Sequence, residues 1–510
     1  MNDNKVLTPD IKRPYIILLV VCIVAVCGII YELLISTAAS YLLGDSVTQF
    51  SIIIGIYMSS MGIGAYLSKF IHKQLFKRFL QIEILLSIVG GASILLIFLF
   101  YSLGGIFFLF ILYGLTVIIG ILVGLEIPLV IRIMEDTLKL KENVANVLAY
   151  DYIGGLIGSI SFPLLLLPTL GIMKTAILIG IFNLLSAIWL LIKVKEFQLR
   201  KKYLTISLCL LIILITGMYF AKPINNYLEQ NLYKDKIIIS EQTPYQKLVV
   251  TKYNNDIRLF IDGNLQFSSI DEYRYHEGLI HIPASIIPHL ENVLILGGGD
   301  GLAVKELLKY KSIKKINLVD LDAKMIELFK TNKLLTKLNK NSLNNEKVTT
   351  ISEDGLNFIK NDNDFYDLII IDLPDPRTTQ LSNLYNKQFY ELIDKRLSKT
   401  GVMVTQATSP FFANKAFWCV AKTVESAFPY SSQYHINVMS FGDWGFVIGS
   451  NIPINVDNIS IKVKTRFLTD ETARNSFIFE KDIIEPKNIS INTLFDPVIV
   501  QYYKESWGNW

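Results

Sequence analysis

Acidic residues follow four successive apolar runs in the second half of the sequence. The runs have the length and composition of buried strands and cover residues 292–296, 315–319, 348–352 and 368–371. The acids that follow them are Asp300, Asp320, Asp354, Asp372 and Asp375. Because ligands bind at the carboxyl ends of strands in such sheets, the pattern predicts one pocket lined by carboxylates.

A glycine-rich turn at residues 297–301 separates the first of these strands from an expected helix. We expect Gly297 and Gly299 to let the backbone approach a ligand closely, next to the free N–H groups of the helix start. Asp320 lies 23 residues after Gly297, which suits a hydrogen bond to ribose hydroxyls. The carboxylate of Asp354 could accept a hydrogen bond from an adenine amino group. The turn therefore predicts the nucleoside end of a ligand.

Basic residues do not accompany these strand ends in the sequence. There is no P-loop lysine and no arginine pair, so a phosphate-rich ligand is poorly served. Carboxylates instead suit a cationic ligand that carries a nucleoside, such as an adenosyl sulfonium compound, together with an amine. NAD, with its pyrophosphate, fits less well. The five histidines show no ligand spacing with cysteine or acids, which predicts no metal site.

The second half of the sequence resembles the spermidine synthase family, the polyamine aminopropyltransferases. The resemblance covers about residues 235–450 and is carried by Asp320 and by motifs at 245–246, 262–266, 271–277, 297–301, 354–355 and 372–376. The apolar first half and the motif at 372–376 resemble the membrane-anchored, multi-span branch. After Pro376 the chain continues with Arg377 rather than the glycine-proline of the soluble enzymes, which leaves the acceptor amine open.

The resemblance implies transfer of an aminopropyl group from decarboxylated S-adenosylmethionine to an amine. Putrescine is the usual acceptor, and the products are spermidine and methylthioadenosine. Decarboxylated S-adenosylmethionine is a co-substrate, and no other cofactor is implied. We also expect a homodimer through the synthase region.

Roles for individual residues follow from the same resemblance. Asp372 matches the acceptor of the amine's proton. The positions that match the donor site are Gln246, Asp320, Asp354 and Gly355, beside Gly297 and Gly299 of the turn. The positions that match or line the amine site are His276, Asp300, Asp375, Tyr275 and Gln266. A structural histidine is the alternative for His276.

The chemistry of two side chains predicts further roles. A carboxylate from Asp300 at the glycine turn would repel the carboxylate of S-adenosylmethionine and attract a bare aminopropyl ammonium, which favours the decarboxylated donor. Trp444 could close the amine pocket by a cation–π contact, with a core tryptophan as the alternative. Two other functions stay open: methyl transfer from S-adenosylmethionine, and polyamine transport or sensing with a regulatory synthase-like domain.

The composition of the chain excludes several classes of protein. The 510-residue chain is 51% hydrophobic and only 18% charged, which excludes a wholly soluble protein. A net charge of +4 is too small to predict nucleic-acid binding, and four cysteines exclude a disulfide framework. Seven runs approach the length of a membrane span: about 15–38, 47–68, 80–101, 105–131, 147–169, 172–193 and 203–221.

The predicted membrane topology contains a conflict. Lys5, Lys12, Arg13 and the basic loops near 69–78, 132–141 and 193–202 place the N-terminus in the cytoplasm. Seven spans would then put the soluble half outside, whereas supply of the donor favours the cytoplasm. We therefore suspect that 147–169 is re-entrant.

Acids inside the apolar runs are few. They are Glu32, Glu83, Glu126 and Asp151. An acid at membrane depth indicates function, with a helix-end or paired acid as the alternative.

The predicted fold class is an N-terminal α-helical transmembrane bundle followed by an α/β region. That region begins with a small β-strand subdomain and continues as a Rossmann-like, doubly wound methyltransferase-type sheet. The expected divisions are residues 1–221, 222–290, 291–450 and 451–510, the last a C-terminal extension. We expect a multi-pass protein of the cell membrane with the lipid bilayer as a partner.

Overall fold

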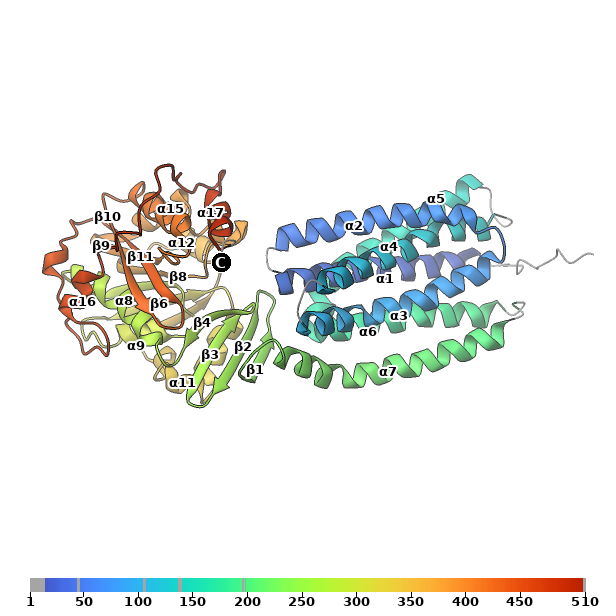
Figure 1. Ribbon diagram of the computed structural model, residues 1–510, viewed down its shortest axis with the longest axis horizontal. Helices are drawn as coiled ribbons and strands as arrows, with labels where there is room; N and C mark the ends of the chain where they lie inside the picture. The colour runs from blue at the N-terminus through green and yellow to red at the C-terminus, as the bar shows by residue number, and fades with distance from the viewer. Residues whose placement is uncertain are drawn as a thin grey trace, which may run out of the picture. The chain divides into compact units, whose positions relative to one another are not determined.

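The computed structural model describes residues 14–43, 46–103, 107–135, 140–194, 197 and 199–507. The chain divides into two compact units, Met1–Ile237 and Ile238–Trp510 (Figure 1). The topology prediction used Lys5, Lys12, Arg13, Lys139 and Lys195, which lie outside the described residues.

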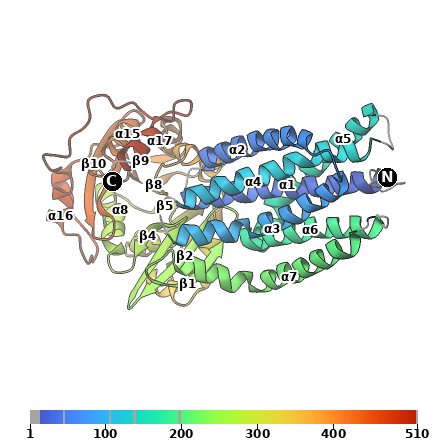
Figure 2. The same cartoon turned by 45° about the vertical axis from the view of Figure 1, so that its right-hand side comes forward.

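The first unit consists of helices that run side by side (Figure 2). They are α1 (Pro14–Leu43), α2 (Ser46–Leu67), α3 (Leu75–Ser102), α4 (Phe107–Ile133), α5 (Leu140–Ser161), α6 (Leu167–Lys193) and α7 (Arg200–Gln230). Apolar side chains form the contacts between them and also cover much of the outside, including Phe110 and Leu164 at 69% and 75% exposure. A helix that is apolar all round is expected inside a large core or in a membrane.

Within the part of this unit that the structure describes, six helical segments are long and apolar enough to cross a membrane, judged by length and composition. The predicted runs 147–169 and 172–193 fall in one of them, Leu140–Lys193, which is 54 residues long. Its two limbs, α5 and α6, are joined by a π-helical turn, and both contact α1. The backbone leaves helical geometry at Gly171, where φ is 72° and ψ is 173°.

The second unit opens with a small antiparallel sheet. Its strands, in spatial order, are β1 (Lys236–Gln242), β2 (Lys247–Tyr253), β3 (Asp256–Ile261) and β4 (Asn264–Ser268). Asp262 and Gly263 connect β3 to β4 with φ values of 49° and 79°, the left-handed geometry that a two-residue hairpin loop needs. Helix α8 (Glu272–Ile286) leads from this sheet to the next.

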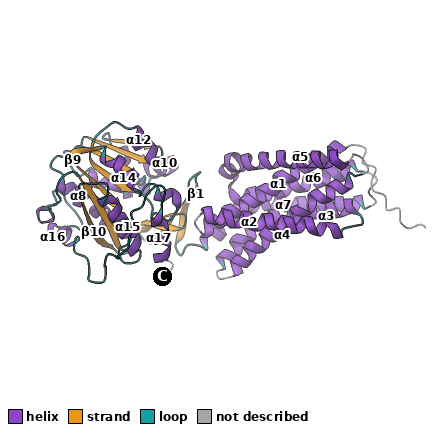
Figure 3. Ribbon diagram, turned by 90° about the horizontal axis from the view of Figure 1, so that it is seen from above, coloured by secondary structure: helices purple, strands orange, loops and turns teal. Residues whose placement is uncertain are grey.

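A seven-stranded sheet forms the centre of the second unit (Figure 3). Its strands are β5 (Asn292–Gly297), β6 (Lys315–Asp320), β7 (Val348–Ser352), β8 (Tyr366–Asp372), β9 (Leu397–Gln406), β10 (Tyr430–Val438) and β11 (Gly442–Ser450). The spatial order is β10-β11-β9-β8-β5-β6-β7, with β11 antiparallel to both of its neighbours and the pairs from β9 to β7 parallel. The predicted fold class is confirmed: a helical first part, a β subdomain and a doubly wound sheet.

Helices and their side chains cover both faces of this sheet. They are α9 (Leu302–Leu307), α10 (Ala323–Thr331), α11 (Leu335–Leu338), α12 (Gly355–Asn361), α13 (Thr379–Ser382), α14 (Lys387–Asp394), α15 (Asn414–Glu425), α16 (Asp470–Asn475) and α17 (Val498–Trp507). Alternate residues of β5 enter two separate cores, Val293 and Ile295 in one and Leu294 and Leu296 in the other. Burial on both faces explains why these strands read as continuous apolar runs.

The chain beyond residue 451 packs against this sheet unit. The carboxylate of Glu277 on α8 accepts backbone N–H groups from Arg466, Phe467 and Leu468 at 2.6–2.9 Å. Helix α17 packs against α15. The C-terminal extension is therefore fastened to the elements that carry the predicted site.

Candidate active site

A cavity of about 260 Å³ opens at the carboxyl ends of β5, β6 and β8. All thirteen residues predicted for the site line it: Gln246, Gln266, Tyr275, His276, Gly297, Gly299, Asp300, Asp320, Asp354, Gly355, Asp372, Asp375 and Trp444. Parallel strands β5, β6 and β8 end at the same edge, so the sheet gathers acids that are far apart in the sequence.

The glycine turn after β5 presses against the end of β8. Gly297 has φ 87°, and a Cβ there would lie 2.1 Å from the carbonyl oxygen of Asp372. Gly298, with φ 64°, donates its N–H to that same oxygen at 3.2 Å. Only glycine combines this conformation with so close an approach. The turn thereby fixes Asp372 beside the cavity.

Asp320 at the end of β6 holds the outer side of the glycine turn. Its Oδ2 accepts the Gly299 N–H at 3.0 Å, and its Oδ1 accepts the Asp322 N–H at 2.9 Å. Burial raises the pKa of Asp320 to about 6, with the negative charges of Asp322 and Asp372 acting in the same direction. A cationic or hydroxyl-bearing ligand would relieve this cost.

Asp322 is a lining residue that the sequence analysis missed. Its Oδ2 accepts hydrogen bonds from Thr243 Oγ1 at 2.8 Å and from Gln246 Nε2 at 2.9 Å. Its Oδ1 caps α10 by accepting the Lys324 N–H. The sequence did contain a signal for the capping role of Asp322, because an acid directly before a helix commonly caps that helix. Asp322 thus sets the orientation of Gln246 at the donor end of the cavity.

Asp372 and Tyr275 form the centre of the site. Tyr275 Oη donates to Asp372 Oδ1 at 2.7 Å. Burial raises the pKa of Asp372, although the charge of His276 and the Tyr275 hydrogen bond oppose the shift. Burial and the neighbouring Asp372 carboxylate hold the pKa of Tyr275 well above its usual range, so the tyrosine stays a donor. One carboxylate oxygen is therefore held while Oδ2 lies on the side of the glycine turn.

Asp375 is held from two directions. Its Oδ2 accepts a hydrogen bond from Tyr503 Oη at 2.9 Å, and its Oδ1 accepts one from Gln406 Nε2 at 3.3 Å. Burial raises the pKa of Asp375, and these two hydrogen bonds oppose the shift. Tyr503 belongs to α17, 128 residues farther along the chain, and no feature of its sequence surroundings indicated this role.

His276 lies in a chain of charges that starts outside the cavity. Its Nδ1–H donates to the backbone oxygen of Glu272 at 2.8 Å and to Glu272 Oε2 at 2.9 Å, and Lys305 Nζ donates to Glu272 Oε1 at 2.6 Å. Burial by itself would lower the pKa of His276, but Glu272, Asp300 and Asp372 raise it to about 9. Burial raises the pKa of Asp300 to about 6, against the charge of His276. Glu272 was not predicted from the sequence.

The remaining predicted residues form the walls. Asp354 Oδ1 caps α12 by accepting the Asn357 N–H at 2.9 Å. The Trp444 and Phe441 rings lie 5.3 Å apart, and both line the cavity. Arg377 also lines it and lies 3.8 Å from Asp262 Oδ2.

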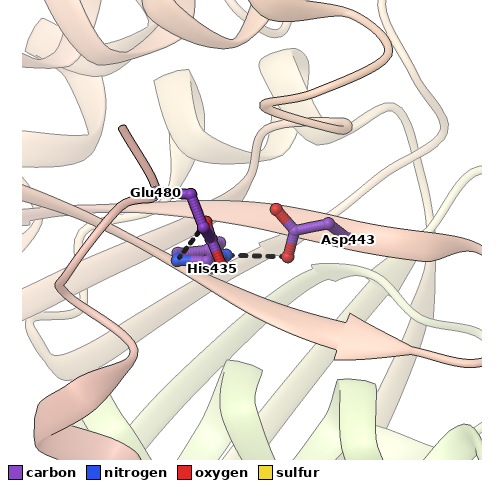
Figure 4. Close-up of side chains that lie close together, drawn as sticks. All are labelled: His435, Asp443 and Glu480. Carbon is purple, nitrogen blue, oxygen red and sulfur yellow. Dashed lines mark hydrogen bonds and ion pairs between the residues drawn. The ribbon is translucent and has the colours of Figure 1, made fainter. Parts of the chain in front are cut away.

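A separate group brings a histidine and two acids together away from this cavity (Figure 4). His435 Nδ1 lies 2.7 Å from Asp443 Oδ1, and its Nε2 lies 3.0 Å from the Ile478 carbonyl oxygen and 3.8 Å from Glu480 Oε2. Both ring nitrogens already serve hydrogen bonds, and Asp443 raises the pKa of His435 against the effect of burial. The geometry is that of an ion-paired histidine that fastens the C-terminal segment to β10, although spacing in the sequence did not reveal the group.

Known proteins resemble this chain over nearly its whole length. A model of the spermine/spermidine synthase domain matches residues 272–458. A polyamine aminopropyltransferase of Leptospira interrogans is 42% identical over 493 residues, which cover 96% of this chain and 98% of the relative. The chain belongs to the polyamine aminopropyltransferase family. A second relative with this name, from Oceanobacillus iheyensis, is 41% identical over 498 residues and covers 96% of each chain.

These alignments extend over the helical unit as well as the synthase unit. A solved spermidine synthase, described in complex with the transition-state analogue AdoDATO, aligns at 22% identity with a TM-score of 0.46, covering 54% of this chain and 89% of its own. The predicted family and the predicted transferase class are confirmed for this aminopropyltransferase.

Proposed function

We propose that this aminopropyltransferase moves the aminopropyl group of decarboxylated S-adenosylmethionine to putrescine or a related amine. The products would be spermidine, or the corresponding longer amine, and methylthioadenosine. The observation that carries the proposal is the gathering of Asp300, Asp320, Asp354, Asp372 and Asp375 around one cavity. Such a site suits a sulfonium donor that binds beside a polycation. Each positive charge of the ligands offsets the free-energy cost of burying a negatively charged carboxylate.

The donor occupies the β5–β7 side in this proposal. Asp320 accepts from the ribose hydroxyls, while Asp354 and Gln246 hold the adenine and thioether end. Asp300 faces the aminopropyl ammonium, where the carboxylate of S-adenosylmethionine would meet like charge. Discrimination between the two donors then comes from one buried carboxylate.

The amine occupies the side formed by α8, β8 and β11. Asp375 holds its far ammonium group, and Trp444 and Gln266 line the remaining wall. Tyr275 orients Asp372 through the 2.7 Å hydrogen bond. Two acids three residues apart thereby take different tasks, one to hold an ammonium and one to accept a proton.

The reaction is a single displacement. The nitrogen lone pair attacks the carbon beside the sulfonium, the C–S bond breaks toward sulfur, and methylthioadenosine leaves as a neutral thioether. The attacking amine must lose a proton, which passes to Asp372 Oδ2. Positioning of the two reactants supplies most of the acceleration, and proton removal by a placed base contributes about 10²–10⁴-fold.

The decisive experiment incubates the purified full-length protein with decarboxylated donor and a panel of diamines and triamines. We expect methylthioadenosine and a lengthened amine in equal amounts. Release of S-adenosylhomocysteine from S-adenosylmethionine would instead indicate methyl transfer. Absence of turnover with every amine would favour a polyamine sensor or transporter.

Asp372→Asn tests the proton acceptor. We expect kcat to fall by about 10²–10⁴-fold, because the amide cannot accept the proton, while the Kd for the donor changes little. Turnover is measured by methylthioadenosine release and donor affinity by calorimetry. Asp367→Asn is a matched control. Asp367 lies at the start of β8, the end opposite to Asp372, and its carboxylate accepts the backbone N–H groups of Glu291 and Asn292. An unchanged rate in Asp372→Asn would refute the assignment.

We further propose that residues 1–221 anchor the protein in the cell membrane as a multi-pass domain. The six apolar segments and their exposed apolar side chains support this. The expected regions 222–290, 291–450 and 451–510 then form the synthase in the cytoplasm, where the donor is made, except that helix α7 continues to Gln230 and the second unit begins at Ile238. A homodimer through this region stays a prediction.

A further inference from the structure

The loop that joins Asp372 to Asp375 lies beyond the end of strand β8. The backbone oxygen of Asp372 is fixed, because it accepts the Gly298 N–H at 3.2 Å. The pairing of β8 with β5 stops at Asp372, and its pairing with β9 stops at Ile371. The place of Asp375 in the cavity therefore depends on the contacts that hold this loop.

Two buried polar side chains, Tyr385 and Gln406, hold the backbone of this loop. The hydroxyl of Tyr385 donates to the carbonyl oxygens of Leu373 at 3.2 Å and Pro374 at 3.0 Å. Nε2 of Gln406 donates to the Leu373 carbonyl oxygen at 2.8 Å and to the Tyr385 hydroxyl at 2.6 Å. The same nitrogen lies 3.3 Å from Asp375 Oδ1. The loop backbone and the carboxylate of Asp375 thus share one hydrogen-bond network.

The orientation of the Gln406 amide is fixed by the chain that follows β9. Its Oε1 accepts the backbone N–H of Thr408 at 2.9 Å. Because a backbone N–H can only donate, the amide oxygen must face Thr408 and the NH₂ group must face the loop. Thr408 has φ 60°, which a β-branched residue rarely adopts, and its carbonyl oxygen accepts the Gly445 N–H at 2.7 Å. Such a conformation persists only where the surrounding structure determines it.

Tyr385 is anchored from both sides. It lies between α13 and α14, with its ring in the core beneath the sheet. The side-chain amide of Asn492 donates to the Ser382 carbonyl oxygen at 3.0 Å, and the Asn492 carbonyl oxygen accepts the Lys387 N–H at 2.9 Å. A buried polar network whose members are held in this way rigidifies the segment that it contacts. The network therefore fixes Asp375, while the glycine turn and Tyr275 fix Asp372.

We propose that Gln406 and Tyr385 are positioning residues that set the distance from Asp372 to Asp375 and thereby select the chain length of the diamine acceptor. The inference rests on the proposed function, in which Asp375 holds the far ammonium group and Asp372 accepts the proton. Only a diamine of matching length brings its attacking nitrogen to Asp372 while its other end stays on Asp375. A misplacement of about 1 Å can cost about 10²-fold in rate, and one methylene group changes kcat/KM by about 10–200-fold.

Tyr385→Phe removes one hydroxyl and keeps the ring in its core. The kcat/KM values of the purified full-length protein are compared for trimethylenediamine, putrescine and cadaverine, three diamines that differ by one methylene group each. We expect the wild type to prefer one of them by at least about tenfold. The variant should reduce this preference at least about threefold, because the loop carbonyls lose a donor, and the Kd for the donor should stay unchanged. General damage to the fold would lower all three kcat/KM values by the same factor and leave the preference intact.

Tyr366→Phe is the matched control. Tyr366 is buried in the same core, but it lies at the start of β8, and its hydroxyl donates to Asp362 Oδ2 at 2.7 Å. This variant should keep the preference of the wild type. Gln406→Met removes every hydrogen bond of the amide and should reduce the preference at least as far as Tyr385→Phe does.

Three results would overturn the proposal, and they are distinguishable from one another. An equal preference in the Tyr385→Phe, Gln406→Met and Tyr366→Phe variants would refute the positioning role and leave the proposed function intact. A wild type that turns over all three diamines equally well would refute selection by chain length. A wild type that turns over no amine would refute the proposed function together with this inference.

Discussion

At the scale of single residues, burial sets the chemistry of the transferase cavity. An aspartate carboxyl group has a pKa near 4 in water. Burial raises the pKa to about 6 in Asp300 and in Asp320, because it removes their charged forms from solvent. Each of these acids therefore favours a cation as its neighbour. The cavity is therefore suited to positively charged groups.

The raised pKa values predict a pH dependence. Asp300 and Asp320 become protonated as the pH falls through about 6, and kcat/KM for the donor should then fall by about tenfold for each carboxylate at one pH unit below its pKa. A carboxyl whose folded pKa is raised binds its proton more strongly in the folded state, so this protonation stabilises the fold as the pH falls toward 4. The loss of activity should accordingly be reversible and free of unfolding. A flat kcat/KM profile between pH 5 and 8 would contradict these assignments.

Gly297→Ala tests the close approach of the turn to β8. The alanine Cβ would meet the Asp372 carbonyl oxygen at 2.1 Å in a backbone conformation that alanine avoids. We expect the synthase unit to lose more than about 2 kcal/mol of stability. Gly355→Ala is the control, because its Cβ would meet only Leu296 Cδ2 at 3.8 Å. Thermal unfolding followed by circular dichroism should show a clear decrease in midpoint for Gly297→Ala alone.

At the scale of elements, the C-terminal helix completes the site. α17 brings Tyr503 to Asp375, and the segment before it is tied to α8 through Glu277. The C-terminal extension is thus part of the wall of the cavity, on the side where we propose that the amine binds.

Tyr503→Phe should therefore affect the amine rather than the donor. Loss of the 2.9 Å hydrogen bond frees Asp375, and we expect KM for the amine to rise by about tenfold with donor Kd unchanged. Tyr502→Phe is the neighbouring control, since the Tyr502 hydroxyl accepts the Ser490 N–H instead. Steady-state kinetics with the amine varied compares the two variants. Identical KM values would show that Tyr503 does not position Asp375.

At the scale of the whole molecule, a helical unit and an enzyme unit share one chain. The relatives align over both units, so the combination is a property of the aligned proteins as well as of this one. If the helical unit anchors the chain in a membrane as proposed, loop charges place the synthase unit outside the cell, whereas the proposed donor would reach it from the cytoplasm. We expect the synthase unit to lie on the cytoplasmic side, where the donor is supplied.

Thiol labelling of intact cells tests this orientation. Lys311→Cys places a cysteine on an exposed loop of the synthase unit. Leu103→Cys places one directly after α3, where the side chain of Leu103 is 71% exposed. We expect an impermeant maleimide to label Lys311→Cys only after lysis, against the background of the four native cysteines. Labelling of Lys311→Cys in intact cells would put the enzyme unit outside.

The sequence by itself determined the helical first part, the strands of the second unit and the acids at one edge of its sheet. These features depend on local hydrophobic periodicity and on the rule that parallel strands end together, as Asp320 and Asp372 illustrate. Only the tertiary structure decided that Tyr503 reaches Asp375 and that Lys305 and Glu272 support His276. Those contacts join elements distant along the chain, and their register depends on side-chain packing, which no short-range pattern specifies.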